Sequence, residues 1–94
     1  MFDIRMSERG EILLSGRCDA SQAEKAEQFF SGVTDSRVVD FRDLEYISSA
    51  GLSVLLATQK RLNESGDSLK LKNLNEYIRD VFRYAGFDTV FEIE

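Results

Sequence analysis

The sequence contains no histidine, no proline and no tryptophan, and Cys18 is its only cysteine. Without histidine, the usual base that activates a serine and the commonest zinc ligand are both missing, so we expect neither a catalytic triad nor a metal site, and no cofactor. A single cysteine excludes an intrachain disulfide and favours a reducing compartment, and we expect Cys18 to be a small buried apolar side chain. No basic start followed by a long apolar run indicates a signal peptide or a membrane span, so we expect a cytoplasmic protein.

Excess positive charge is also lacking. The 94 residues include 17 acidic and 12 basic side chains, which gives a net charge of −5. This charge repels phosphate backbones and anionic lipids, so nucleic acid and membrane surfaces are poor candidate partners. The chain is short for two domains and has no repeat or low-complexity linker, so residues 1–94 are interpreted as one domain.

Hydrophobic spacing predicts an α/β fold. Alternation and short apolar runs predict strands at residues 2–6, 12–14, 37–41, 69–71 and 90–93, and apolar spacings of three or four predict helices at 19–32, 49–66 and 75–86. The segment 37–41 is interpreted as a central strand buried on both faces, and Ser21 with Glu24 as a capping box. We expect a mixed sheet with an N-terminal antiparallel hairpin, parallel crossovers and helices packed on the sheet.

Inward-facing residues are predicted for each helix from the same spacing. They are Ala23, Ala26, Phe30 and Val33 in the first helix, Leu52, Leu55, Leu56 and Leu62 in the second, and Ile78, Val81, Phe82 and Ala85 in the third. Asn75 is predicted to cap the third helix, and Gly66 and Gly86 are predicted to end the second and third.

Two hydroxyls stand where the second helix begins, in the segment Tyr46-Ile-Ser-Ser-Ala-Gly-Leu52. A helix needs only one serine as its N-cap. Gly51 is a poor helix former in the first turn, at a cost of roughly 1 kcal/mol against alanine. We interpret the bare glycine as allowing another protein to approach the serine hydroxyl closely.

The segment YISSAGLSVLL at 46–56 resembles the signature of STAS domains, especially that of bacterial anti-sigma factor antagonists. The resemblance extends to GRCD at 16–19, VVDF at 38–41 and VFRYAGF at 81–87, and so covers nearly the whole chain. The serine motif with its glycine and leucine is fairly specific, whereas the other segments are weak when taken singly.

The resemblance implies a regulatory module that is not an enzyme. In such partner-switching systems the unphosphorylated antagonist binds an anti-sigma factor that is also a serine kinase of the histidine-kinase-like ATPase type. The kinase inactivates the antagonist by phosphorylating a serine, and a serine phosphatase of the PP2C type reverses this. By motif position the acceptor is Ser49. Many relatives have aspartate before the acceptor, but this chain has Ser48, which is the less favoured second acceptor. The implied partner-binding residues are Asp19, Ser48, Ser49, Ala50, Gly51, Leu52 and Ser53.

Asp19 follows the predicted second strand, and the fold is expected to bring it near the Ser49 loop. It is interpreted as a helix N-cap that also orients the acceptor hydroxyl or contacts the partner.

Two other functions stay open at this stage. A STAS-like chain could be a constitutive subunit of a transporter ATPase, or an interaction module that does not depend on phosphorylation. Asp40, at the end of a predicted buried strand, suggests the acceptor of a receiver domain, but the acidic pair and the lysine that a receiver needs do not appear.

No functional site is assigned to the remaining charged and aromatic residues. Asp40, Asp43 and Glu45 are expected to be solvated loop carboxylates rather than a Mg²⁺ site. Lys70 and Lys72 share one strand face and are expected to be solvated edge lysines, although they could touch an acidic partner. Tyr77 and Tyr84 on the third helix are taken as partly buried aromatic residues.

Overall fold

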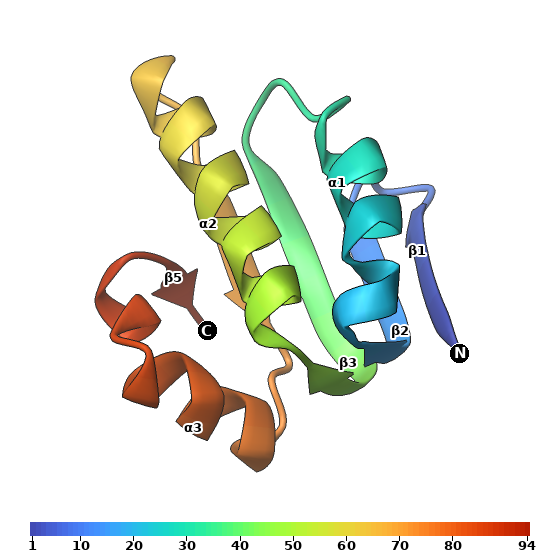
Figure 1. The fold of residues 1–94 in the computed structure, drawn as a ribbon. Coiled ribbons are helices and arrows are strands. Elements are labelled where there is room, and N and C mark those ends of the chain that lie inside the picture. The colour runs from blue at the N-terminus through green and yellow to red at the C-terminus, as the bar shows by residue number, and fades with distance from the viewer.

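The computed structural model describes all residues from Met1 to Glu94 and contains five strands and three α-helices (Figure 1). The strands are β1 (Phe2–Met6), β2 (Ile12–Cys18), β3 (Arg37–Ile47), β4 (Leu69–Lys72) and β5 (Glu92–Ile93). The α-helices are α1 (Ala23–Phe30), α2 (Ser49–Glu64) and α3 (Glu76–Tyr84), and short 3-10 turns occupy Ala20–Gln22 and Phe87–Thr89.

The strands form one sheet in the order β1-β2-β3-β4-β5. β1 pairs antiparallel with β2, and the remaining neighbours are parallel. The hairpin turn places Gly10 at a φ of 80°, a conformation that glycine adopts without a Cβ penalty. The predicted fold class and the N-terminal hairpin are therefore confirmed.

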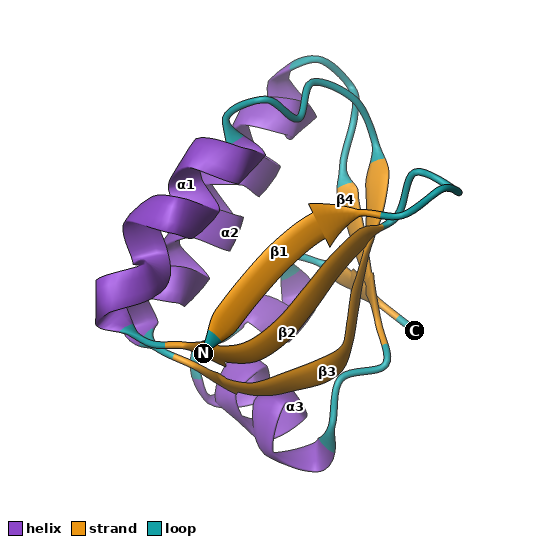
Figure 2. Ribbon diagram, turned by 90° about the vertical axis from the view of Figure 1, so that its right-hand side faces the viewer, coloured by secondary structure: helices purple, strands orange, loops and turns teal.

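Helices α1 and α2 lie side by side on one face of the sheet, and no helix covers the opposite face of β1, β2 and β3 (Figure 2). A cluster of 22 buried apolar residues fills the space between the helices and the sheet. α3 joins this core through Phe82, whose ring meets those of Phe41 and Phe91 edge-on with centroids 5.8 Å apart. Such aromatic pairs add about 0.5–1.5 kcal/mol to the burial of their area.

The third strand differs from its prediction in length and environment. It continues to Ile47 rather than ending near Phe41, and it is not buried on both faces. Val39, Phe41, Leu44 and Ile47 are buried, whereas the charged residues between them remain partly or fully exposed. A sheet covered on one side needs apolar residues on one face only, so these charges do not interrupt the strand.

The start of the first helix confirms one prediction and contradicts another. Asp19 is an N-cap, as expected, of the 3-10 turn that precedes α1, but the Ser21–Glu24 capping box does not form. Val33 is buried but lies beyond the end of α1. Asn75 caps α3 as predicted, by accepting a hydrogen bond from the Ile78 amide at 2.8 Å.

Four of the predicted inward-facing residues are not fully buried. Ala23 and Val81 are partly buried against the core, Leu56 is only half-buried on α2, and Ala85 is exposed just after α3. α2 instead buries the polar residues Thr58 and Gln59. The Gln59 side chain accepts a hydrogen bond from the Leu69 amide at 2.8 Å and donates one to the Val90 carbonyl at 3.1 Å, so its burial is compensated.

β4 is an inner strand, so Lys70 and Lys72 are not edge lysines. Lys70 pairs with Glu92 at 3.2 Å and Lys72 with Glu11 at 3.0 Å, so both charges are engaged within the chain. None of the helices has the length and apolar character that a bilayer crossing requires.

Candidate functional site

The carboxyl ends of β2 and β3 lie together and form the candidate site. Cys18 pairs with Ile47 in the parallel register, and the Ser48 amide donates to the Cys18 carbonyl at 2.8 Å. The segment after β2 therefore begins with Asp19 beside the segment after β3, which begins with Ser48. The structure thus brings the Asp19 segment beside the segment that contains Ser48 and Ser49, as expected.

Ser48 is the N-cap of α2. Its backbone is extended, with φ −85° and ψ 169°, and its hydroxyl oxygen accepts a hydrogen bond from the Gly51 amide at 3.2 Å. Ser48 is half-buried. Its hydroxyl therefore has a structural task, which is to satisfy one of the unpaired amides of the first helical turn.

Ser49 is the first residue of α2 and is exposed. Its carbonyl accepts a hydrogen bond from the Ser53 hydroxyl at 3.0 Å, but its own hydroxyl bonds to no group of the chain. Of the three serines in this turn, Ser48 and Ser53 thus have engaged hydroxyls and Ser49 has a free one. An enzyme that modifies hydroxyl groups can reach the Ser49 oxygen without first breaking a cap.

Gly51 has an internal role, which replaces the interpretation that it opens the site to another protein. It is buried, and a Cβ at this position would lie 2.9 Å from the Cys18 sulfur and 2.9 Å from Cγ1 of Ile47. Only a residue without a side chain lets the first turn of α2 approach the ends of β2 and β3 so closely. Leu52 is also buried, at 7 % exposure, so both residues support the loop from inside.

An open hollow of about 510 Å³ lies beside the serine turn, between α1 and α2. Ala50 and Ser53 line it at the serine end, and Val54 and Ala57 continue it along α2. Glu24 and Glu27 of α1 also line it. This hollow is not visible in the sequence, because the residues from the two helices come together only through the packing of α1 on α2.

Asp19 remains ionised at neutral pH. The Ser21 hydroxyl donates to its carboxylate at 2.6 Å and the Ser21 amide at 3.0 Å. The hydrogen bond from the Ser21 side chain, followed by those from backbone amides and the Arg17 charge, lowers the pKa of Asp19 despite some opposing desolvation. The site therefore carries a fixed negative charge near Ser48 and Ser49.

Cys18 lies beneath this turn as a buried side chain with 3 % exposure. Burial, and to a lesser extent the neighbouring Asp19 charge, raises the pKa of its thiol. A thiol held in its neutral form inside the core is a poor nucleophile.

A stack of side chains from β2, β3 and α3 flanks the site. The Arg17 guanidinium lies 4.5 Å from the centre of the Tyr46 ring, and the Tyr46 and Tyr77 rings stack with centroids 6.5 Å apart. Tyr77 is 52 % exposed and Tyr84 is 91 % exposed, so the interpretation of Tyr84 as partly buried is wrong. Sequence reasoning could have found the Arg17–Tyr46 pair from the parallel register of β2 and β3.

The acidic residues of β3 do not form a site. No group of three or more potential ligand residues is close enough to hold a metal ion. Asp40 lies within β3, and accepts hydrogen bonds from Asn73 at 3.0 Å and the Arg42 amide at 2.9 Å. Burial opposes its charged form, but these bonds and the charges of Arg42 and Lys72 keep the pKa of Asp40 below its ordinary value. Asp43 and Glu45 are exposed residues of the strand, not of a loop.

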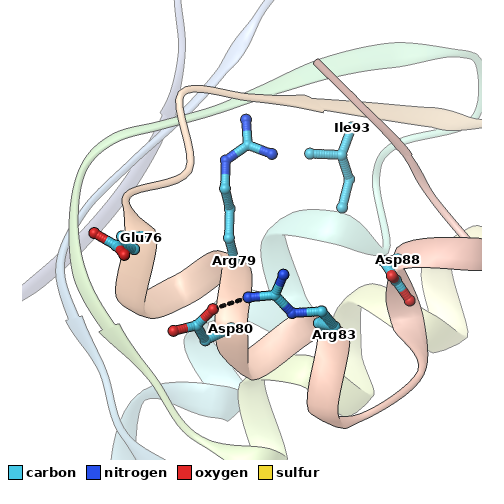
Figure 3. Close-up of a pocket in the computed structure, with 6 residues that line it drawn as sticks. All are labelled: Glu76, Arg79, Asp80, Arg83, Asp88 and Ile93. Atoms are coloured by element: carbon cyan, nitrogen blue, oxygen red, sulfur yellow. Dashed lines mark hydrogen bonds and ion pairs between the residues drawn. The ribbon is translucent and has the colours of Figure 1, made fainter.

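A polar hollow of about 500 Å³ lies between α3 and the C-terminal segment (Figure 3). Arg79 and Arg83 project into it, and Glu76, Asp80 and Asp88 line it as well. Arg83 pairs with Asp80, and Arg79 donates to the Glu94 carbonyl at 2.7 Å. Because the acidic residues balance the two arginines, this hollow has no preference for an anion.

Comparison with protein families gives a match over residues 4–93 to a family model described as Mlab, STAS domain. The chain is 37 % identical over 83 residues to BtrV of Bordetella bronchiseptica, which is named as an anti-sigma factor antagonist; the match covers 87 % of this chain and 70 % of BtrV. It is 29 % identical over 96 residues to the anti-sigma-B factor antagonist of Bacillus subtilis, with 97 % of this chain and 87 % of that protein covered.

Solved structures share the fold. The structure of Bacillus SpoIIAA in its phosphorylated form matches with a TM-score of 0.71 at 20 % identity, covering 100 % of this chain and 91 % of that one. The unphosphorylated anti-sigma factor antagonist SpoIIAA matches with a TM-score of 0.76 at 20 % identity, over 100 % of this chain and 88 % of that one.

Proposed function

The chain belongs to the STAS domain family, and from this premise we propose that it is an anti-sigma factor antagonist whose binding to its partner is switched off by phosphorylation of Ser49. The observation that carries the proposal is that the hydroxyl groups of the two serines have different environments. Ser48 caps α2 through its hydroxyl, whereas the hydroxyl of Ser49 is exposed and unbonded. In this role the chain is the substrate of a kinase and not itself an enzyme.

Phosphorylation at Ser49 leaves the fold intact. A phosphoserine carries about −1.5 to −2 charges at neutral pH. At the first residue of a helix the macrodipole favours a negative group by roughly 0.3–1 kcal/mol. The added phosphate displaces no hydrogen bond of the Ser49 hydroxyl, because that hydroxyl makes none within the chain.

The same phosphate disrupts a fitted interface. Residues 48–53 contain no basic side chain to neutralise it, and Asp19 and Glu24 add negative charge nearby. Burying the unpaired phosphate against a partner costs about 2–5 kcal/mol, which lowers affinity by roughly tens to thousands of fold. Binding is lost while the structure is kept, as a reversible switch requires.

The partner surface consists of the exposed part of the site. Asp19, Ser48, Ser49, Ala50 and Ser53 offer side chains to a partner, and Gly51 and Leu52 hold the turn in shape from beneath. The partner in this proposal is an anti-sigma factor that is also a serine kinase of the histidine-kinase-like ATPase type. A PP2C-type serine phosphatase restores the binding form, and these reactions take place in the cytoplasm. The names of BtrV and the B. subtilis relative support the antagonist role, and the phosphorylated SpoIIAA structure supports a phosphorylated state for this fold.

The test is phosphorylation by the cognate anti-sigma kinase and ATP, with the phosphosite located by mass spectrometry. We expect one phosphate on Ser49, its loss in Ser49→Ala, and full labelling of Ser65→Ala, which removes an exposed serine at the far end of α2. Labelling of Ser48 in the wild-type protein, or of a residue outside the turn, would overturn the assignment. Stable binding of the kinase by phosphorylated protein would instead favour a constitutive subunit, such as one of a transporter ATPase.

A further inference from the structure

Strand β1 forms one edge of the sheet and has no strand on its outer side. The Arg17 amide donates to the Met1 carbonyl at 3.1 Å, which makes Met1 and Arg17 a hydrogen-bonded pair. In an antiparallel pair, hydrogen-bonded and non-bonded positions alternate. The odd residues of β1 therefore direct their amide groups to β2, and the even residues direct theirs outward. A hydrogen bond of Lys25 supports this alternation. The Lys25 ammonium group donates to the Phe2 carbonyl at 3.0 Å, so this carbonyl points away from β2.

The outward amide groups of Phe2, Ile4 and Met6 can pair with the same groups of a second copy. An antiparallel pair about a two-fold axis must bring even residues opposite even residues. With Ile4 opposite itself, Phe2 lies opposite Met6, and Asp3 lies opposite Arg5 at the closely spaced non-bonded positions. This register uses the full length of the five-residue strand.

Charge selects this register over its neighbours. The next allowed registers are those in which the second copy slides along β1 by two residues. Sliding in one direction places Asp3 opposite Asp3, and sliding in the other direction places Arg5 opposite Arg5. Opposite charges directly across a strand pair stabilise it, and like charges destabilise it. Both side chains are exposed; Arg5 takes part in none of the chain's ion pairs, and Asp3 has only a 4.0 Å contact with Lys25.

The apolar side of the strand favours the same arrangement. Met6 is 42 % exposed at the end of β1, although it belongs to the face that buries Phe2 and Ile4. In the symmetric register, Met6 lies across from Phe2 of the second copy. The edge lacks the usual protections of a proline or a bulge, and Lys25 alone crosses it.

We propose that two copies of this chain associate through β1, with Asp3 of each copy paired with Arg5 of the other, to form one continuous ten-stranded sheet from the two five-stranded ones. Lys25 releases the Phe2 carbonyl to the Met6 amide of the second copy, which limits the strength of the dimer. The Ser49 turn follows β3, the third strand from this edge, and remains free in both copies. Formation of the dimer therefore does not depend on the proposed phosphorylation, and each proposal can fail without the other.

The experiment uses two single charge reversals and their combinations in sedimentation equilibrium. Wild-type protein is expected to dimerise reversibly with concentration. Asp3→Arg and Arg5→Asp each create two like-charge contacts across the axis, and each is expected to raise the dissociation constant at least about tenfold. The double variant D3R/R5D restores opposite charges and is expected to dimerise again.

Mixing the two single variants gives the sharpest result. Asp3→Arg carries two arginines on its edge strand, and Arg5→Asp carries two aspartates. The mixture is therefore expected to form a heterodimer with a lower dissociation constant than the homodimer of either variant. Native mass spectrometry distinguishes the three species. Asp88→Arg and Lys60→Asp, which reverse exposed charges away from β1, serve as controls that leave dimerisation unchanged. Circular dichroism verifies that each variant folds.

A wild-type chain that stays monomeric at millimolar concentration would overturn the proposal. So would a dimer that both single reversals leave intact, or a loss of dimerisation that neither the double variant nor the mixture restores.

Discussion

Replacing Gly51 with alanine tests whether the serine turn depends on the close packing of α2 on the strand ends. The new methyl group would lie 2.9 Å from the Cys18 sulfur and 2.9 Å from Cγ1 of Ile47. Both atoms are attached directly to Cβ, so neither side chain can swing away as a long flexible one could. Overpacking of this kind costs about 1–3 kcal/mol.

Helix propensity opposes this cost. Alanine is better than glycine in a helix by about 1 kcal/mol, so we expect a net loss of about 1 kcal/mol in the free energy of unfolding, within a range of about 0–2 kcal/mol. For a domain of this size, a loss of about 1 kcal/mol lowers Tm by about 4–8 °C. Urea unfolding followed by circular dichroism measures the free energy, and calorimetry measures Tm.

Gly32→Ala provides the matched control. A Cβ on Gly32 meets only the Phe29 carbonyl, at 3.6 Å, and its φ is not in the left-handed region. It should therefore be neutral, or stabilise the protein by about 0.4–1 kcal/mol. Removing the sulfur with Cys18→Ala should make Gly51→Ala less harmful in the double variant than in the wild-type background. The packing role of Gly51 is refuted if Gly51→Ala is as stable as Gly32→Ala, because a methyl group at residue 51 then costs no more than one at a site with ordinary contacts.

Two further predictions concern hydrogen bonds and charges away from the candidate site. Arg61 donates to the Phe30 and Val33 carbonyls, both at 2.8 Å, so Arg61→Ala should lower the free energy of unfolding in urea by about 1–2 kcal/mol; an unchanged urea midpoint would show that these bonds contribute nothing. The pKa of Asp40 is lowered in the folded state from its ordinary 3.8, so its stabilisation is present above that pH and is lost as the pH falls through the lowered value. The difference in stability between the wild type and Asp40→Asn should accordingly be constant near neutrality and shrink below about pH 4; a difference that grows with acidification would contradict the sign.

The sequence was sufficient to predict the elements whose signals are local. Phe2, Ile4 and Met6 alternate within β1, and Asn75 and Gly86 mark the two ends of α3. These features depend on neighbours within a few residues, so no tertiary information is needed to find them.

Features that arise from tertiary packing could not be predicted in this way. Asp40, Arg42 and Asp43 made β3 look shorter than it is, because a charged residue is compatible with a strand whose outer face meets water. The Ser21–Glu24 capping box does not form, since the chain enters α1 through a 3-10 turn that Asp19 caps.

The candidate site likewise combines features that the sequence predicts with features that only the structure shows. The serine motif was visible in the sequence, but the assignment of the cap to Ser48 and of the free hydroxyl to Ser49 needed the hydrogen bonds of the first helical turn. The role of Gly51 needed the distances to Cys18 and Ile47, which come from different strands.

Titration of the cognate anti-sigma kinase with the Ser49-phosphorylated and unphosphorylated proteins, alongside their melting curves, tests the phosphorylation switch most directly. We predict that phosphorylation weakens binding by roughly tens to thousands of fold, while Tm changes by no more than about 8 °C, since the helix terminus accommodates the charge at a cost or gain below about 1 kcal/mol. Equal affinities for the two forms, or a loss of binding accompanied by unfolding of the phosphorylated protein, would contradict the account.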